Sequence, residues 1–144
     1  MVRLVIDGAA KLAGLRRAAI ARINIRAGEV RGRFITIAAG QEMIYLGKEA
    51  EALRYLAARQ QGEPDLAGYP FMAAEIGITA PTPDALAQLW AAMAARWREV
   101  GSTIEQARLG AVAVVERAPG APAIAAAVEA WEAAAAAIEA VADA

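Results

Sequence analysis

The chain has 144 residues, enough for one domain of ordinary size, and it contains neither cysteine nor histidine. Without these two residue types it has no disulfides, thiolate nucleophiles, imidazole bases, common catalytic triads or usual zinc sites. Apolar residues make up 58% of the chain, but many are alanine, and aromatic residues are only 6%. Because alanine favours helix and buries little area, the composition predicts helices with a thin core that needs partners.

Charge is distributed unevenly along the chain. Residues 1–33 hold eight basic and two acidic residues, a net charge of +6, and the remaining residues hold seven basic and fourteen acidic residues, a net charge of −7. The two parts should therefore attract one another. The opening residues lack the uninterrupted apolar run of a secretory signal, and glutamates interrupt the alanine-rich stretch 122–142, which argues against a membrane span.

The first half of the chain predicts two helices with a break between them. The first covers residues 9–27, where apolar side chains recur at spacings of three and four: Leu12, Leu15, Ala19 and Ile23. Glycines and β-branched residues at 28–40 predict an irregular or extended segment. The second helix covers 41–61 and carries one apolar seam: Met43, Leu46, Ala50, Leu53 and Ala57. A short helix is predicted at 72–77.

The second half predicts two longer helices separated by Pro119, Gly120 and Pro122. Thr82, Pro83 and Asp84 are typical of a helix start, and this helix should run to about Arg117. Its seam keeps heptad spacing throughout: Leu86, Trp90, Met93, Trp97, Val100, Ile104, Ala107, Ala111 and Val114. The last helix repeats the pattern: Ile124, Val128, Trp131, Ala135, Ile138 and Ala142.

These segments together predict an all-α fold, a helical bundle or hairpin with coiled-coil-like heptad seams. We expect a basic N-terminal helical segment at 1–33, a helical module at 34–118 and an alanine-rich C-terminal helix at 119–144, together forming one domain. A seam with a period of 3.5 residues can pair within one chain or between copies of it. The spacing does not choose between these two arrangements.

The acidic residues do not form a recognisable metal or catalytic motif. Glu49 and Glu51 point to different sides of their predicted helix. Glu129, Glu132 and Glu139 share a helix, but the histidine that accompanies glutamate in di-metal helical bundles is absent, so we expect a solvated face. The chain also lacks a phosphate-binding glycine loop. The sequence therefore predicts no catalytic residue, no metal and no cofactor.

Two groups of residues are candidates for an interface with other molecules. The first is the basic segment 11–33, which could dock on an acidic protein surface or, less favourably, contact nucleic acid phosphates: Arg16, Arg22, Arg26 and Arg33. The second group consists of large seam residues, which by default fill a core but also occur at the centres of protein interfaces: Trp90, Trp97, Ile104, Trp131 and Ile138.

One ordered pattern covers more than half of the chain. Its members are Arg33-Phe34-Ile35-Thr36, Gly40-Gln41, Tyr45, Lys48, Glu51-Ala52, Tyr55-Leu56, Tyr69-Pro70, Ala74-Glu75, Gly77, Thr79, Trp97, Ile104-Glu105 and Arg108. This order resembles a helical module of tail and tail-fibre-associated proteins from bacteriophages and prophages of GC-rich proteobacteria. The resemblance brings no catalytic residue with it.

The resemblance implies a virion structural protein of the tail or fibre-attachment region. From the composition, we expect no enzymatic activity and no membrane contact. Such a protein would be made in the host cytoplasm and would pack against other virion proteins and copies of itself. A second hypothesis is a chaperone of tail or fibre assembly that does not enter the virion. A third, less favoured, is a helical nucleic-acid-binding protein, whose binding would weaken steeply with salt.

Overall fold

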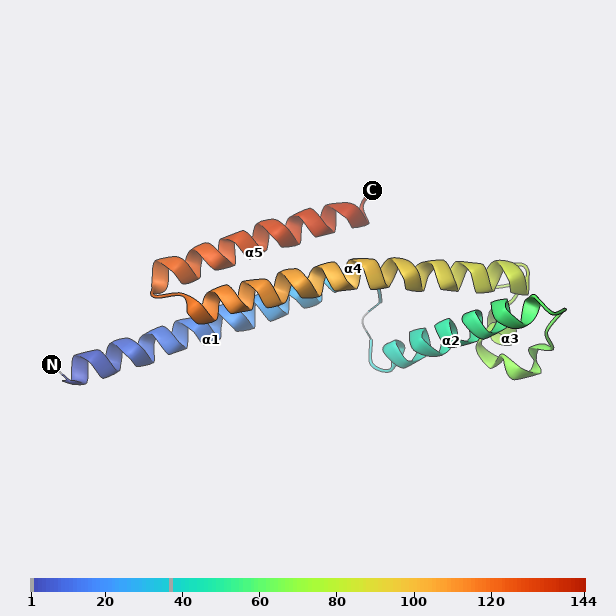
Figure 1. The fold of residues 1–144 in the computed structure, drawn as a ribbon, viewed down its shortest axis with the longest axis horizontal. Coiled ribbons are helices and arrows are strands. Elements are labelled where there is room, and N and C mark those ends of the chain that lie inside the picture. Colours follow the sequence, from blue (N-terminus) through green and yellow to red (C-terminus); the bar gives the residue numbers. More distant parts are fainter. Residues whose placement is uncertain (1, 37) are drawn as a thin grey trace. The chain divides into compact units, whose positions relative to one another are not determined.

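The protein is built from helices, as the sequence predicts. A computed structural model describes residues 2–36 and 38–144, with side chains from Asp7 onward, and no strand occurs in this part of the chain. Figure 1 shows the elements in chain order: α1 (Val2–Gly32), α2 (Gln41–Arg59), the 3₁₀ helix η1 (Leu66–Gly68), α3 (Pro70–Glu75), α4 (Pro83–Arg117) and α5 (Ala121–Ala142). The all-α fold class is therefore confirmed.

The chain forms two compact units. Unit 1 consists of residues 1–35 and 100–144, and unit 2 consists of residues 36–99, so that α4 contributes its first part to unit 2 and its last part to unit 1. The three segments expected from the sequence divide the chain differently. Their boundaries followed the proline, glycine and charge pattern, which carries no information about which distant helices pack together.

In unit 1, α1 and α5 pack against each other. Alanines and larger apolar side chains share the buried faces of both helices: Ala19, Ile23, Ala27 and Val30 on α1, and Ile124, Ala127, Trp131 and Ala135 on α5. The predicted seam of the last helix thus faces inward, and its other members Val128, Ile138 and Ala142 are half-buried. From α4, Ile104 and Val115 add fully buried side chains.

The break expected at 28–40 begins later in the structure. Helix α1 continues to Gly32, and Ala27 and Val30 are both fully buried. These two side chains extend the face begun by Ala19 and Ile23, and their burial outweighs the weak helix propensity of Gly28 and Gly32, which is about 1 kcal/mol per glycine. Residues 33–36 form a turn rather than a strand, and Ile37 lies outside the described residues.

Unit 2 has a core of its own, formed by α2, α3, η1 and the start of α4. Its buried members are Ala52, Tyr55, Tyr69, Met72, Leu86, Ala87 and Trp90. The start of α4 is capped as predicted, since the Thr82 hydroxyl accepts a hydrogen bond from the Ala85 amide at 3.2 Å. Between α3 and α4, Gly77 adopts φ 84°, and its amide donates to the Ala80 carbonyl at 2.7 Å. This conformation favours glycine.

The long seam predicted on α4 is not buried as one continuous stripe. Leu86, Trp90 and Ile104 are buried, but Met93 and Val114 are exposed, and Val115 is fully buried in place of Val114. A straight α-helix has 3.6 residues per turn, so its faces drift by about 20° per heptad relative to a 3.5-residue repeat. This drift explains why Val115 is buried in place of Val114, four heptads after Leu86, but it does not explain the exposure of Met93.

Glu51 is a buried carboxylate that the sequence does not single out as structural. Its side chain on α2 accepts the Phe71 amide at 3.1 Å and the Met72 amide at 2.9 Å. These are backbone donors at the start of α3, which have no partner within their own helix. Glu51 therefore joins α3 to α2.

We predict that Glu51→Ala destabilises the protein by about 2–3 kcal/mol, because one buried and one partly buried amide donor lose their acceptor. Urea unfolding followed by circular dichroism measures this loss. The matched control is Glu42→Ala, which removes an exposed glutamate from the same helix and should change stability by less than about 0.5 kcal/mol. Equal effects of the two substitutions would contradict the role of Glu51.

Candidate interaction surface on helix α2

Helix α2 packs one face against the rest of unit 2. Tyr55 is buried on this face, its hydroxyl donates to Asp84 at 2.9 Å, and its ring meets Tyr69 edge-on at 5.7 Å between centroids. Lys48 makes an ion pair with Glu75, and its ammonium lies 5.1 Å from the centre of the Trp90 ring. Polar and aromatic contacts thus hold α2 against α3 and the start of α4.

Further contacts fix the rotation of α2 about its own axis. Arg59 pairs with Asp84 at 3.1 Å, close to the Tyr55 hydroxyl. Near the start of the helix, the Tyr45 hydroxyl accepts the Thr36 amide at 3.3 Å. Because these partners come from several segments, α2 cannot turn about its axis without losing several contacts together.

The opposite face of α2 is apolar and exposed. Met43 is 77% exposed, Leu46 68% and Leu53 50%, and Ala50 and Ala57 between and after them are exposed as well. These five residues are the seam predicted for this helix, and they are called the α2 stripe below. Their spacing puts them on one face of α2, opposite the face that carries Lys48 and Tyr55.

Phe71 extends this apolar surface beyond the helix. Its ring lies directly against Gly47, where a Cβ atom would come within 2.5 Å of the ring. Phe71 is itself 36% exposed. Glycine at position 47 therefore lets an aromatic side chain of α3 lie beside the α2 stripe.

The basic candidates on α1 make ion pairs inside unit 1. Arg26 pairs with Glu139 at 2.7 Å and with Glu132 at 3.1 Å, both on α5, and with Glu29 at 3.2 Å. The hydrogen bond with Glu139 is the main cause of a raised Arg26 pKa. Arg22 is more exposed and pairs with Glu132 at 3.4 Å. The attraction expected between the basic and acidic parts of the chain is thus observed within unit 1.

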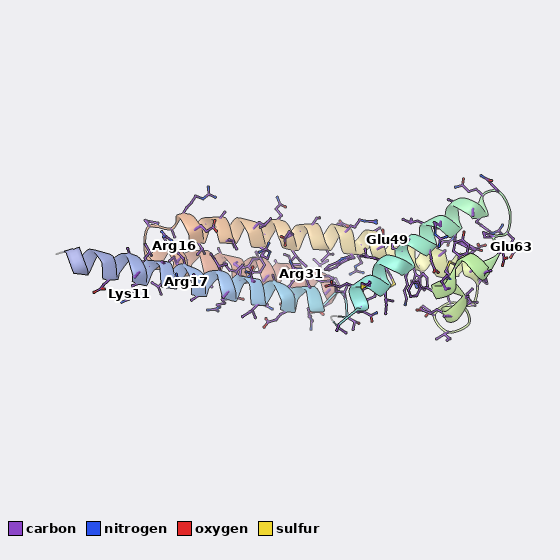
Figure 2. The ribbon with its side chains drawn as sticks, turned by 90° about the horizontal axis from the view of Figure 1, so that it is seen from below. Lys11, Arg16, Arg17, Arg31, Glu49 and Glu63 are labelled. Atoms are coloured by element: carbon purple, nitrogen blue, oxygen red, sulfur yellow. The ribbon has the colours of Figure 1, made fainter. Side chains whose placement is uncertain are left out.

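The remaining two basic candidates, Arg16 and Arg33, bind groups near the ends of α4 and α5. The Arg16 guanidinium donates to the Ala118 carbonyl at 2.6 Å, just beyond the end of α4, where a helix leaves carbonyls without partners. Arg33 pairs with Asp143 at 2.7 Å near the end of α5. Lys11 and Arg17 are exposed on α1, and Figure 2 marks them together with Arg16 and Arg31.

The large seam candidates are mainly core residues. Trp90 is buried in unit 2, and Trp131 and Ile104 are buried in unit 1. Trp97 and Ile138 are half-buried. The structure therefore does not bring these five side chains together at one exposed surface.

The acidic residues considered as a possible site have separate structural roles. Glu49 makes an ion pair with Arg98 within unit 2 and is labelled in Figure 2 together with Glu63, which follows α2. Glu129 is exposed as expected, but Glu132 and Glu139 bind Arg26, so the expectation of a solvated face is wrong for these two residues. Across the described residues, no three acidic side chains gather as potential metal ligands.

Several members of the sequence pattern make the polar contacts of unit 2. Lys48 and Thr79 both bind Glu75, with the Thr79 hydroxyl at 2.8 Å, and Tyr45, Glu51 and Tyr55 make the contacts given above. The last members of the pattern belong to unit 1. There, Glu105 pairs with Arg108 and with Arg31. These members of the pattern therefore make polar contacts within their own unit.

Comparison with protein-family models, with curated protein sequences and with solved structures finds no match to this chain. Over the described residues, no helix combines the length and apolar character needed to cross a membrane. The α2 stripe is the surface that the sequence candidates missed. The sequence contained one indication of this surface: helix 41–61 has an apolar seam on one face and also has tyrosines and alanines on the opposite face.

Glu75 is the carboxylate that joins α3 to α2 through Lys48. Partial burial tends to raise its pKa, but the hydrogen bonds from Lys48 and Thr79 outweigh burial, so the pKa of Glu75 is lowered from 4.5. The ionised form is thus favoured in the folded state. Its contribution to stability is complete above the unfolded-state pKa and is lost as the pH falls through the lower folded-state pKa.

We predict that Glu75→Gln is less stable than the parent protein at neutral pH, because the substitution removes the ion pair with Lys48. The difference should shrink as the pH falls from neutral through the lowered folded-state pKa of Glu75, and it should vanish once the parent carboxylate is also protonated. Thermal melts of both proteins across this range provide the measurement. A stability difference that is the same at neutral and acidic pH would contradict the assignment.

Proposed function

We propose that the protein is a structural component of a bacteriophage tail or of the region where tail fibres attach. It acts by packing its helices against other proteins in the virion and not by catalysis. The observation that carries the packing part of the proposal is the α2 stripe, an apolar surface left uncovered by its own chain. The phage assignment is supported by the resemblance of the ordered pattern from Arg33 to Arg108.

The ion pairs of unit 1 favour a protein partner over nucleic acid. Arg22, Arg26, Arg31 and Arg33 all face acidic side chains of their own chain. A phosphate backbone would have to compete with these carboxylates for the same guanidinium groups. The exposed apolar stripe, in contrast, needs no intrachain contact to be broken before a protein can cover it.

We predict that the protein is present at a constant ratio to known tail proteins in particles purified from a phage or lysogen that carries its gene. Quantitative mass spectrometry of the particles measures this ratio. Leu46→Lys combined with Leu53→Lys should reduce incorporation at least about tenfold, because charge replaces the apolar stripe. The control Leu109→Lys changes an exposed leucine of α4 and should be incorporated normally.

The alternative function, an assembly chaperone, predicts a different distribution. Such a protein would be abundant in lysates during tail assembly and missing from purified particles. This outcome would contradict the virion assignment while leaving a role in packing against tail proteins intact.

A further inference from the structure

The α2 stripe has the chemistry of a two-stranded helical seam. Met43, Ala50 and Ala57 occupy one set of positions seven residues apart, and Leu46 and Leu53 occupy the other set. In paired helices with this spacing, each seam side chain inserts between four residues of the facing helix. In a parallel pair the two leucines would meet their counterparts in the second copy, and Met43 and the alanines would meet theirs, so that the apolar positions of the two copies coincide along the seam.

We propose that two copies of the chain pair in parallel through α2, with the α2 stripe of one copy packed against the α2 stripe of the other. This inference rests on the proposed function, in which the protein acts by packing, and it names a second copy of this chain as the partner of the stripe. The occupant and the direction of pairing both follow from the charges beside the stripe.

Glu49 and Arg54 lie on opposite flanks of the stripe, five residues apart. In a parallel pair, such flanking positions face each other across the seam, so that Glu49 of each copy meets Arg54 of the other. In an antiparallel pair centred on Ala50, equivalent flanks meet, and the two Glu49 side chains would lie close together. Opposite charges therefore favour the parallel arrangement, and like charges disfavour the antiparallel one.

Both flanking side chains have contacts within their own chain that can coexist with pairing. Glu49 binds Arg98, and Arg54 donates one N–H to the Gly68 carbonyl at 3.1 Å and lies over the Tyr69 ring. A carboxylate accepts up to four hydrogen bonds, and a guanidinium donates five. Arg54 is exposed, and the Glu49 side chain is 18% exposed beside its ion pair with Arg98, so a contact across the seam would form at this remaining surface of Glu49.

Because unit 2 is already folded, pairing through this short seam costs less conformational entropy. A helix of two heptads is marginal in isolation because ordering the backbone costs conformational entropy. Here α2 is already held in place by Tyr55, Lys48 and Glu51 through the contacts described above. Pairing then orders mainly side chains, and we expect a dissociation constant in the micromolar range, on the order of 1–100 μM.

Cysteine cross-linking tests the proposal sharply because the chain contains no native cysteine. In a parallel pair the two Ala57 positions are neighbours, so the full-length Ala57→Cys variant should form a disulfide-linked dimer under mild oxidation. In an antiparallel pair centred on Ala50, position 57 of one copy faces position 43 of the other and lies about 21 Å along the helix from its own counterpart. Only a mixture of Met43→Cys and Ala57→Cys would then give efficient cross-links between different variants.

The matched control is Ala58→Cys, an exposed position next to Ala57 that points about 100° away from it. It should cross-link at least about tenfold more slowly than Ala57→Cys. Adding Leu46→Lys and Leu53→Lys to Ala57→Cys should reduce its cross-linking to the rate of this control. Circular dichroism should show unchanged helix content, because both leucines are exposed within the chain.

Light scattering of the unmodified protein over a concentration series completes the test. A rise toward twice the chain mass of 15.0 kDa, with selective cross-linking of Ala57→Cys, is the expected result. A monomer at every concentration would overturn the pairing, as would cross-linking confined to the Met43→Cys and Ala57→Cys mixture. A monomer that still enters phage particles would leave the proposed function standing, whereas a dimer that is missing from particles would contradict only the virion assignment.

Discussion

Helix α2 carries apolar side chains on two opposite faces, and its own unit provides neighbours for only one of them. Three directional contacts decide which face of α2 packs inward. The Tyr55 hydroxyl donates to Asp84, the Lys48 ammonium pairs with Glu75, and the Glu51 carboxylate accepts from the amides that begin α3. Because these contacts all lie away from the α2 stripe, satisfying them leaves the stripe outside. The arrangement of α3 and the exposed surface of unit 2 both follow from this constraint.

Unit 1 meets a different constraint, because half of the buried side chains that α1 and α5 provide are alanines. Alanines contribute little buried area. Arg26 compensates by binding Glu132 and Glu139 across this contact, and Arg16 caps the end of α4. The positive charge of the N-terminal segment is thus largely used within the chain, which explains why a basic sequence does not produce an open basic surface at these residues.

Local signals were sufficient for much of the fold. The cap at Thr82, the end of α4 before Pro119 and the inward seam of α5 follow from short-range preferences that the packing does not oppose. The end of α1 and the exchange of Val114 for Val115 depend on packing between distant helices, which a single sequence does not contain. The exposure of the α2 stripe also depends on distant contacts. The residue spacing identifies the seam, but its outward direction follows from the contacts that Tyr55 and Lys48 make with other segments.

The rotation of α2 can be tested by methionine oxidation followed by peptide mass spectrometry, because the thioether reacts according to its exposure. Met43 belongs to the α2 stripe, Met72 is fully buried on the inner side of unit 2, and Met93 is exposed on α4 as an internal control. In dilute folded protein, Met43 and Met93 should oxidise rapidly and Met72 slowly, and at high protein concentration only Met43 should become slower. Rapid oxidation of Met72 together with protection of Met43 in dilute protein would contradict the account.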